Sequence, residues 1–168
     1  MAPTIRNETP ADIAAIDAVT KAAFLPAAHA SHTEHFIVQA LREAGALELS
    51  LVAEMDGTVA GHVAASPVSI SDGSVGWFGV GPVSVLPHFQ RRGIGTLLVR
   101  EVLRRLREGG AAGCVLLGDP AYYRRFGFRV EPGLILPDVP AEYFQALSWQ
   151  SPPPRGTVSY HEAFYVQG

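Results

Sequence analysis

A loop rich in arginine and glycine joins a buried strand to an amphipathic helix in the middle of the chain. Residues 83–86, VSVL, are mostly apolar and β-branched, which is typical of a buried strand. From Gly95 onward, apolar residues recur at helical spacing. Between them lies QRRGIG, residues 90–95, which puts two arginines and two glycines at the start of the helix.

This helix start has the features of an anion-binding site. The first N–H groups of a helix lack partners within it and point outward at the positive end of the helix dipole. Gly93 and Gly95 leave the backbone accessible, and Arg91 and Arg92 add permanent positive charge. Two common phosphate motifs do not match. The P-loop needs a lysine that is absent here, and Leu98 stands where a dinucleotide fingerprint has its third small residue.

Two motifs together resemble the GNAT superfamily, the acetyl-coenzyme-A-dependent N-acetyltransferases. Q-x-x-G-x-G at residues 90–95 matches the family's loop for the coenzyme A pyrophosphate, and Y-x-x-F-G-F at residues 123–128 looks like its segment after the fifth strand. The resemblance implies one α/β domain over residues 1–168, with a mixed, mostly antiparallel sheet flanked by helices. It also implies direct transfer of the acetyl group of acetyl-CoA to a primary amine, with no covalent enzyme intermediate and no metal.

The resemblance assigns roles to residues of both motifs. Tyr123 would protonate the departing thiolate and is the candidate catalytic residue. Tyr122 competes for this role, because adjacent side chains on a helix point about 100° apart and only one can face the sulfur. The strand backbone would bind the acetyl and pantetheine groups, and the loop would bind the pyrophosphate. The residues expected to bind acetyl-CoA are Val83, Ser84, Val85, Gln90, Arg91, Arg92, Gly93, Ile94, Gly95 and Thr96.

These motifs leave the general base unassigned. Many members of the family carry a glutamate on the fourth strand, but residues 76–81, GWFGVG, contain no acidic residue. Glu34, His62 and Asp72 are candidates, and so is a chain of ordered water. Cys114 is a poor candidate for a nucleophile, because it lies in a predicted buried strand.

Composition and length fit an ordinary globular protein. The 168 residues are 48% hydrophobic, with a net charge of −3, and suit one domain with a substantial core. No apolar run reaches the length of a membrane span, the start lacks a signal-peptide pattern, and the single cysteine precludes an internal disulfide. We therefore expect a cytoplasmic protein.

Periodicity and turn signals predict a mixed sheet of strands with helices on its faces. Helices are expected from Pro10, after the capping pattern at 31–34, over 93–108 and near 121–126. The expected strands are residues 3–7, 49–54, 58–70, 77–85, 113–117, a segment from Phe128, 144–149 and 157–166, with an Asp56-Gly57 hairpin turn after the second.

Two further patterns suggest other functions that the sequence does not favour. Arg100, Arg104 and Arg107 lie opposite the apolar stripe of their helix, which is typical of a solvated face. An RNA-binding regulator could use this face, but the acidic chain argues against nucleic-acid binding. His29, His32 and the histidine three residues further on, His35, do not converge at helical spacing, so no metal site is expected there.

The identity of the acceptor is not encoded in a recognised motif. Two hydrophobic and proline-rich loops, residues 24–31 and 137–155, favour a small molecule over a charged peptide. The absence of the strand glutamate keeps a non-catalytic acyl-CoA-binding module as the alternative to an enzyme. A homodimer is compatible with the family, although no residue requires one.

Overall fold

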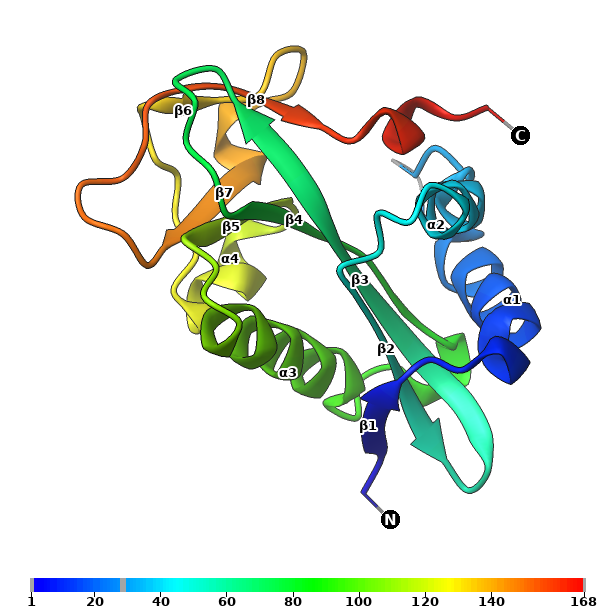
Figure 1. The fold of residues 1–168 in the computed structure, drawn as a ribbon. Helices are drawn as coiled ribbons and strands as arrows, with labels where there is room; N and C mark the ends of the chain where they lie inside the picture. Colours follow the sequence, from blue (N-terminus) through cyan, green and yellow to red (C-terminus); the bar gives the residue numbers. More distant parts are fainter. Residues whose placement is uncertain (1, 28–29, 168) are drawn as a thin grey trace.

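The computed structural model describes residues 2–27 and 30–167 and has a mixed sheet with helices on both faces (Figure 1). Its strands are β1 (Thr4–Asn7), β2 (Leu49–Met55), β3 (Thr58–Ile70), β4 (Trp77–Val85), β5 (Gly113–Leu117), β6 (Leu134–Ile135), β7 (Phe144–Ser148) and β8 (Gly156–Tyr160). Its helices are α1 (Ile13–Phe24), α2 (Glu34–Glu43), α3 (Ile94–Glu108) and α4 (Pro120–Tyr123).

The sheet has the order β1-β2-β3-β4-β5-β7, and β8 joins the far end of β3 and also pairs with β6. Among the strand pairs of the described residues, β4–β5 and β6–β8 are parallel and the others are antiparallel. The predicted mixed, mostly antiparallel sheet is therefore confirmed, as is the hairpin between β2 and β3.

Alternation along the strands divides the core between the two faces of the sheet. Leu51 packs in the cluster that contains Leu98 of α3, whereas its neighbour Val52 packs with Ile16 of α1 and Val38 of α2. Figure 1 shows the same arrangement, with α3 on one side of the sheet and α1 and α2 on the other. None of the helices in the described ranges is long and apolar enough to cross a membrane.

An ion-pair cluster anchors the edge strand β1 to the start of the first helix. Arg6 donates to Asp12 at 2.7 Å and to Glu54 of β2 at 2.9 Å. The Thr9 N–H donates to the same Asp12 carboxylate at 2.7 Å, in a capping box around a 3₁₀ turn that leads into α1. The hydrogen bonds from Arg6 hold the pKa of Asp12 well below its usual range.

The C-terminal quarter differs most from the sequence prediction. The strand expected from Phe128 is wrong, because residues 128–133 make only a single bridge, Arg129 to Ala146, before the two-residue strand β6. The strand expected over 157–166 ends at Tyr160. There His161 Nδ1 accepts from the Ala163 N–H at 3.0 Å and caps a 3₁₀ turn, Glu162–Tyr165. The short helix near 121–126 starts earlier, at Pro120, and continues as a 3₁₀ turn.

Candidate active site

The site begins where β4 and β5 separate. These two parallel strands pair only where Trp77–Gly79 of β4 lie opposite Gly113–Val115 of β5. The rest of β5 pairs with β7 alone. On the other side, the β3–β4 register shifts so that Val63 opposes Val83 but Ala65 opposes Val80. The second half of β4 is therefore paired on one side only, and its other edge faces the gap between the strands.

The register determines which backbone groups face this gap. The Leu86 N–H donates to the Ala60 carbonyl at 2.8 Å. In an antiparallel ladder every second pair of opposed residues is hydrogen-bonded through the backbone, so Ser84 and His62 form the next bonded pair. Val83 and Val85 then direct their N–H groups and carbonyls away from β3, toward the gap. Backbone contact with acetyl-CoA stays a prediction for these two valines, whereas Ser84 uses its backbone in the ladder.

The loop after β4 brings the chain directly into the start of α3. Gly93 has a φ of 80°, a left-handed conformation that glycine adopts without a steric penalty, and it forms the N-cap of the helix. The first intrahelical bond of α3 runs from Leu97 N–H to the Gly93 carbonyl at 3.1 Å. The N–H groups of the residues between them, Ile94, Gly95 and Thr96, have no helical partner.

The side chains around this helix start leave it accessible from the gap. A Cβ added at Gly95 would lie 3.7 Å from a methyl of Val85 and 3.8 Å from the Tyr122 hydroxyl, so these groups bound a small hollow. Arg91 and Arg92 are exposed, and Arg92 lies over the ring of Phe89 at 5.4 Å. The predicted arrangement of two arginines beside a bare helix start is thus present in the structure.

The Gln90 side chain has a local structural contact. Its amide donates to the Val85 carbonyl at 3.0 Å and so ties the loop back to the end of β4. This hydrogen bond occupies the outward-facing carbonyl of Val85, whereas the Val85 N–H still faces the gap without a partner from Gln90. The predicted contact of Gln90 with acetyl-CoA therefore competes with a bond that the protein makes to itself.

The adjacent tyrosines of α4, the short helix after β5, occupy different environments. The Tyr122 hydroxyl hydrogen-bonds Thr96 at 2.8 Å, and its ring lies under the Arg125 guanidinium at 4.3 Å. The Tyr123 ring packs against Gly118 so closely that any Cβ there would overlap it. We find no hydrogen-bond partner for the Tyr123 hydroxyl within the described ranges. Tyr123 thus retains an unused donor beside the core of the sheet.

Burial controls the ionisation of Tyr123. It raises the pKa of the phenol to about 12, with smaller contributions from Tyr122 and Asp119. The hydroxyl therefore carries its proton at any physiological pH. The fully buried Cys114 also has its thiol pKa raised by burial, which fits its predicted lack of nucleophilic reactivity.

A cavity of about 1010 Å³ opens beside the free part of β4. Its walls come from the end of α1, the start of α2, Val80–Pro82, residues 136–139, β8 and residues 164–165. The loops expected to border the acceptor contribute, but so does β8, which sequence analysis treated only as a strand. No motif marks β8 as a cavity wall, because this role depends on its long-range pairing with β3.

The three candidate bases lie in very different places. Asp72 is exposed in the β3–β4 turn, where it accepts from the Arg155 N–H at 3.1 Å. His62 is completely buried, with its Nε2 2.8 Å from the Ser50 hydroxyl, and burial lowers its pKa to about 4. Glu34 alone of the three lines the cavity.

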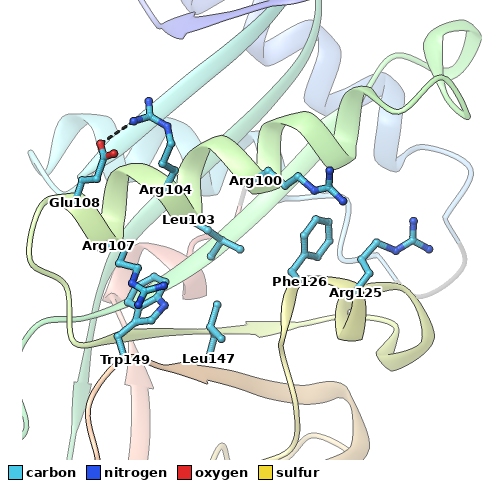
Figure 2. A pocket seen from close by; sticks show the side chains of 9 residues that line it. All are labelled: Arg100, Leu103, Arg104, Arg107, Glu108, Arg125, Phe126, Leu147 and Trp149. Carbon is cyan, nitrogen blue, oxygen red and sulfur yellow. Dashed lines mark hydrogen bonds and ion pairs between the residues drawn. The ribbon is translucent and has the colours of Figure 1, made fainter.

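Figure 2 shows a second hollow, of about 700 Å³, between α3, the turn at Phe126 and β7. Arg104 is paired there with Glu108 at 2.7 Å, and it also bonds Glu101. Arg105 bonds Glu101 at 2.9 Å. These networks agree with the solvated arginine face predicted for α3. Of the three histidines spaced three residues apart, His29 lies outside the described residues; within the described residues no group of side chains could hold a metal ion.

A family model described as an acetyltransferase (GNAT) domain matches residues 4–130. The chain belongs to the GNAT acetyltransferase family. It is an acyltransferase of that family, and the fold and the resemblance inferred from the two motifs are confirmed. A relative in Escherichia coli K12, the uncharacterized N-acetyltransferase YhbS, is 42% identical over 127 residues, which are 75% of this chain and 73% of YhbS.

Solved structures of two relatives superpose closely on this GNAT domain. A GNAT family acetyltransferase from Brucella melitensis in complex with acetyl-CoA is 53% identical, with a TM-score of 0.87 over 96% of this chain and 97% of its own. YhbS from E. coli in complex with CoA is 37% identical, with a TM-score of 0.90 over 100% of this chain and 94% of its own.

Proposed function

We propose that this protein transfers the acetyl group of acetyl-CoA to the primary amine of a small molecule. The observation that carries the proposal is the continuity of the outward-facing backbone of β4 with the unpaired N-terminus of α3. A coenzyme lying in the gap would meet the N–H groups of Val83 and Val85 along its pantetheine arm and those at the start of α3 at its pyrophosphate. The two close relatives that have been crystallised with acetyl-CoA or CoA support this choice of cosubstrate.

The donor half of the reaction uses groups with fixed positions. The Val83 N–H can donate to the acetyl carbonyl oxygen and stabilise the negative charge that develops on it. The pyrophosphate would lie at Ile94, Gly95 and Thr96, with Arg91 and Arg92 nearby. Because these donors belong to a strand and a helix, they need no rearrangement when the coenzyme binds.

The chemistry is a direct displacement at the thioester. The neutral amine nitrogen forms a bond to the carbonyl carbon, and the tetrahedral intermediate collapses with cleavage of the carbon–sulfur bond. The nitrogen loses a proton to a base, and the thiolate is stabilised by the Tyr123 hydroxyl. A phenol pKa of about 12 exceeds the usual thiol value of about 8.5. Tyr123 therefore acts chiefly as a hydrogen-bond donor to the sulfur, with solvent completing the protonation.

The acceptor half is the cavity beside β4. It adjoins Gly81 and Pro82, immediately before the valines that face the thioester, so an amine bound in it would approach the acetyl carbon from this side. A volume of about 1010 Å³ suits a small molecule, since ligand pockets typically enclose about 300–1000 Å³.

Calorimetric titration with acetyl-CoA tests the donor site. The native protein should bind, and Gly95→Glu should weaken binding at least about a hundredfold, because the new carboxylate would clash with the pyrophosphate and repel it. Val75→Glu is the matched control: it adds the same charge at an 82% exposed position, at the opposite end of β4, and should bind like the native protein. Absence of acetyl-CoA binding by the native protein, or full binding by Gly95→Glu, would refute the proposed site.

The alternative is a non-catalytic acyl-CoA-binding module, which the lack of a carboxylate on β4 favours. Release of the CoA thiol can be followed with a thiol-reactive dye across a panel of primary amines. Amine-dependent release by the native protein supports the transferase. Tight acetyl-CoA binding without release from any amine supports the binding module.

A further inference from the structure

The charged side chains in the described part of the acceptor cavity lining are both acidic. Two acidic residues, Glu34 and Asp138, border it, and the described part of the lining contains no lysine, arginine or histidine. Asp138 lies exposed at the rim, on the segment between β6 and β7. Glu34 lies in the first turn of α2 and is partly buried. Net negative charge in an otherwise largely apolar cavity favours a cationic ligand.

The two oxygens of Glu34 have different surroundings. Oε2 accepts from both the N–H and the hydroxyl of Ser31, each at 3.0 Å. Oε1 is buried and has no hydrogen-bond partner within the described ranges. The turn before α2 accounts for the first oxygen, because Ser31, two residues before the N-cap Thr33, donates to it with both its N–H and its hydroxyl. It does not account for the second.

An unpaired, buried carboxylate oxygen is costly. Leaving a charged acceptor desolvated without a donor costs more than leaving a neutral group without one. A ligand ammonium supplies both the donor and the opposite charge. The contacts of Oε2 with Ser31 hold the Glu34 side chain at the cavity wall. Because Oε1 is buried, the ammonium reaches it through a local movement of the groups that cover it.

The remaining walls define what carries the ammonium. Phe24, Ile37, Leu136, Val139 and Phe164 surround the cavity with apolar surface. A ligand that bore its own carboxylate would meet Glu34 and Asp138 with the same sign of charge. The cavity therefore suits a primary amine attached to an uncharged, apolar body.

We propose that Glu34 binds the ammonium of an apolar primary amine and takes up the proton that the nitrogen must lose before it attacks the thioester. This inference rests on the proposed acetyl transfer and fills the role of the base that β4 lacks. The first proton moves from nitrogen to the Glu34 carboxylate, and the freed lone pair forms the new bond to the acetyl carbon. The second proton leaves the nitrogen to solvent as the carbon–sulfur bond breaks and the thiolate departs. Free amino acids and acidic peptides are excluded as good acceptors.

The binding part is tested without catalysis. CoA-loaded protein is titrated with three amines, hexylamine, cyclohexylmethylamine and 2-phenylethylamine, and with the alcohol that matches each in shape. The native protein should bind at least one amine at least tenfold more tightly than its alcohol. Glu34→Gln should lose this preference, because the glutamine keeps an oxygen for Ser31 but has no charge. Glu43→Gln, at an exposed position on the same helix, should keep it.

The catalytic part is tested by acetyl transfer to the amine that binds best. Glu34→Gln should lower kcat/KM at least about a hundredfold and leave the Kd for acetyl-CoA unchanged. Glu34→Asp, which retains the charge one methylene further back, should fall between the native protein and Glu34→Gln. If Glu34→Gln does not fold, Glu34→Asp is the variant whose kcat/KM is compared with that of the native protein.

The outcomes separate the two proposals. No preference for any amine over its alcohol, including no binding at all, overturns the assignment of Glu34 and of the apolar amine class. Persistence of the preference in Glu34→Gln overturns the binding role, and an unchanged kcat/KM in that variant overturns the role as base. In each of these cases, intact acetyl-CoA binding leaves the transferase proposal standing. Only loss of acetyl-CoA binding by the native protein removes both.

Discussion

Tyr122 and Tyr123 are adjacent in sequence, but only one of them has an uncommitted hydroxyl. Tyr122 is tied to Thr96 at the start of α3, whereas Tyr123 is held by its contact with Gly118 and has no partner in the described structure. We therefore expect Tyr123→Phe to lower kcat about a hundredfold, since it removes the donor to the leaving sulfur. Tyr122→Phe should change kcat only a few-fold. Steady-state rates with saturating acetyl-CoA distinguish the two.

Thermal unfolding provides the control for this tyrosine pair. Both phenylalanine variants keep the ring and its packing, so both should melt within a few degrees of the native protein. A larger loss of kcat in Tyr122→Phe than in Tyr123→Phe would reverse the assignment of the two residues.

At the scale of elements, a single carboxylate links the edge strand β1 to the turn before α1. Asp12 caps the turn before α1 and also pairs with Arg6 of β1. Asp12→Ala should lower the free energy of unfolding by about 2 kcal/mol, because the cap and a partly buried ion pair are lost together. Urea denaturation measures this loss. Asp12→Asn keeps an acceptor for Thr9 and should lose about half as much; equal losses in the two variants would mean that the cap contributes nothing.

Local signals predicted most of these elements. Caps, the Asp56-Gly57 turn and alternating apolar residues indicated β1 to β5 and the first three helices, because these elements depend on short-range chemistry. The end of β8 was missed because the His161 cap competes with extension of an apolar, aromatic segment. The loop and the tyrosine motif predicted the donor side of the site. Glu34 could be named as one base among three, but only the pairing of β8 with β3 places it in a cavity.

At the scale of the whole molecule, a buried polar chain links α2, the end of β1, β2 and β3. Arg42 donates to Glu8 at 2.8 Å, Glu8 bonds Ser50, and Ser50 lies 2.8 Å from His62. Burial would raise the pKa of Glu8, but the bonds from Arg42 and Ser50 lower it overall. The carboxylate therefore stays ionised while His62, whose pKa burial lowers to about 4, stays neutral.

This neutral histidine makes stability fall in mild acid. The unfolded chain takes up a proton at His62 near pH 6.5, whereas the folded protein resists until about pH 4. Stability is thus fully present above pH 6.5 and should fall by about 3 kcal/mol as the pH drops to 4. Urea denaturation between pH 7 and 4.5 should show this slope.

Two histidine variants test the origin of that slope. His62→Gln should remove most of the dependence between pH 6.5 and 4.5, although it also lowers stability at pH 7. His88→Gln, at an exposed position, should leave the slope as it is. A slope that survives His62→Gln would assign the acid sensitivity to other groups.

The acceptor cavity is built by stretches of chain that lie on both sides of the point where the family model ends. The family model ends at residue 130, yet residues 136–139, β8 and residues 164–165 form a large part of the cavity wall. The parts proposed to hold acetyl-CoA all lie before that point. Exchange of one contiguous C-terminal stretch could therefore give the enzyme a new acceptor while its donor machinery remained intact, so that substrate range and chemistry can diverge separately in evolution.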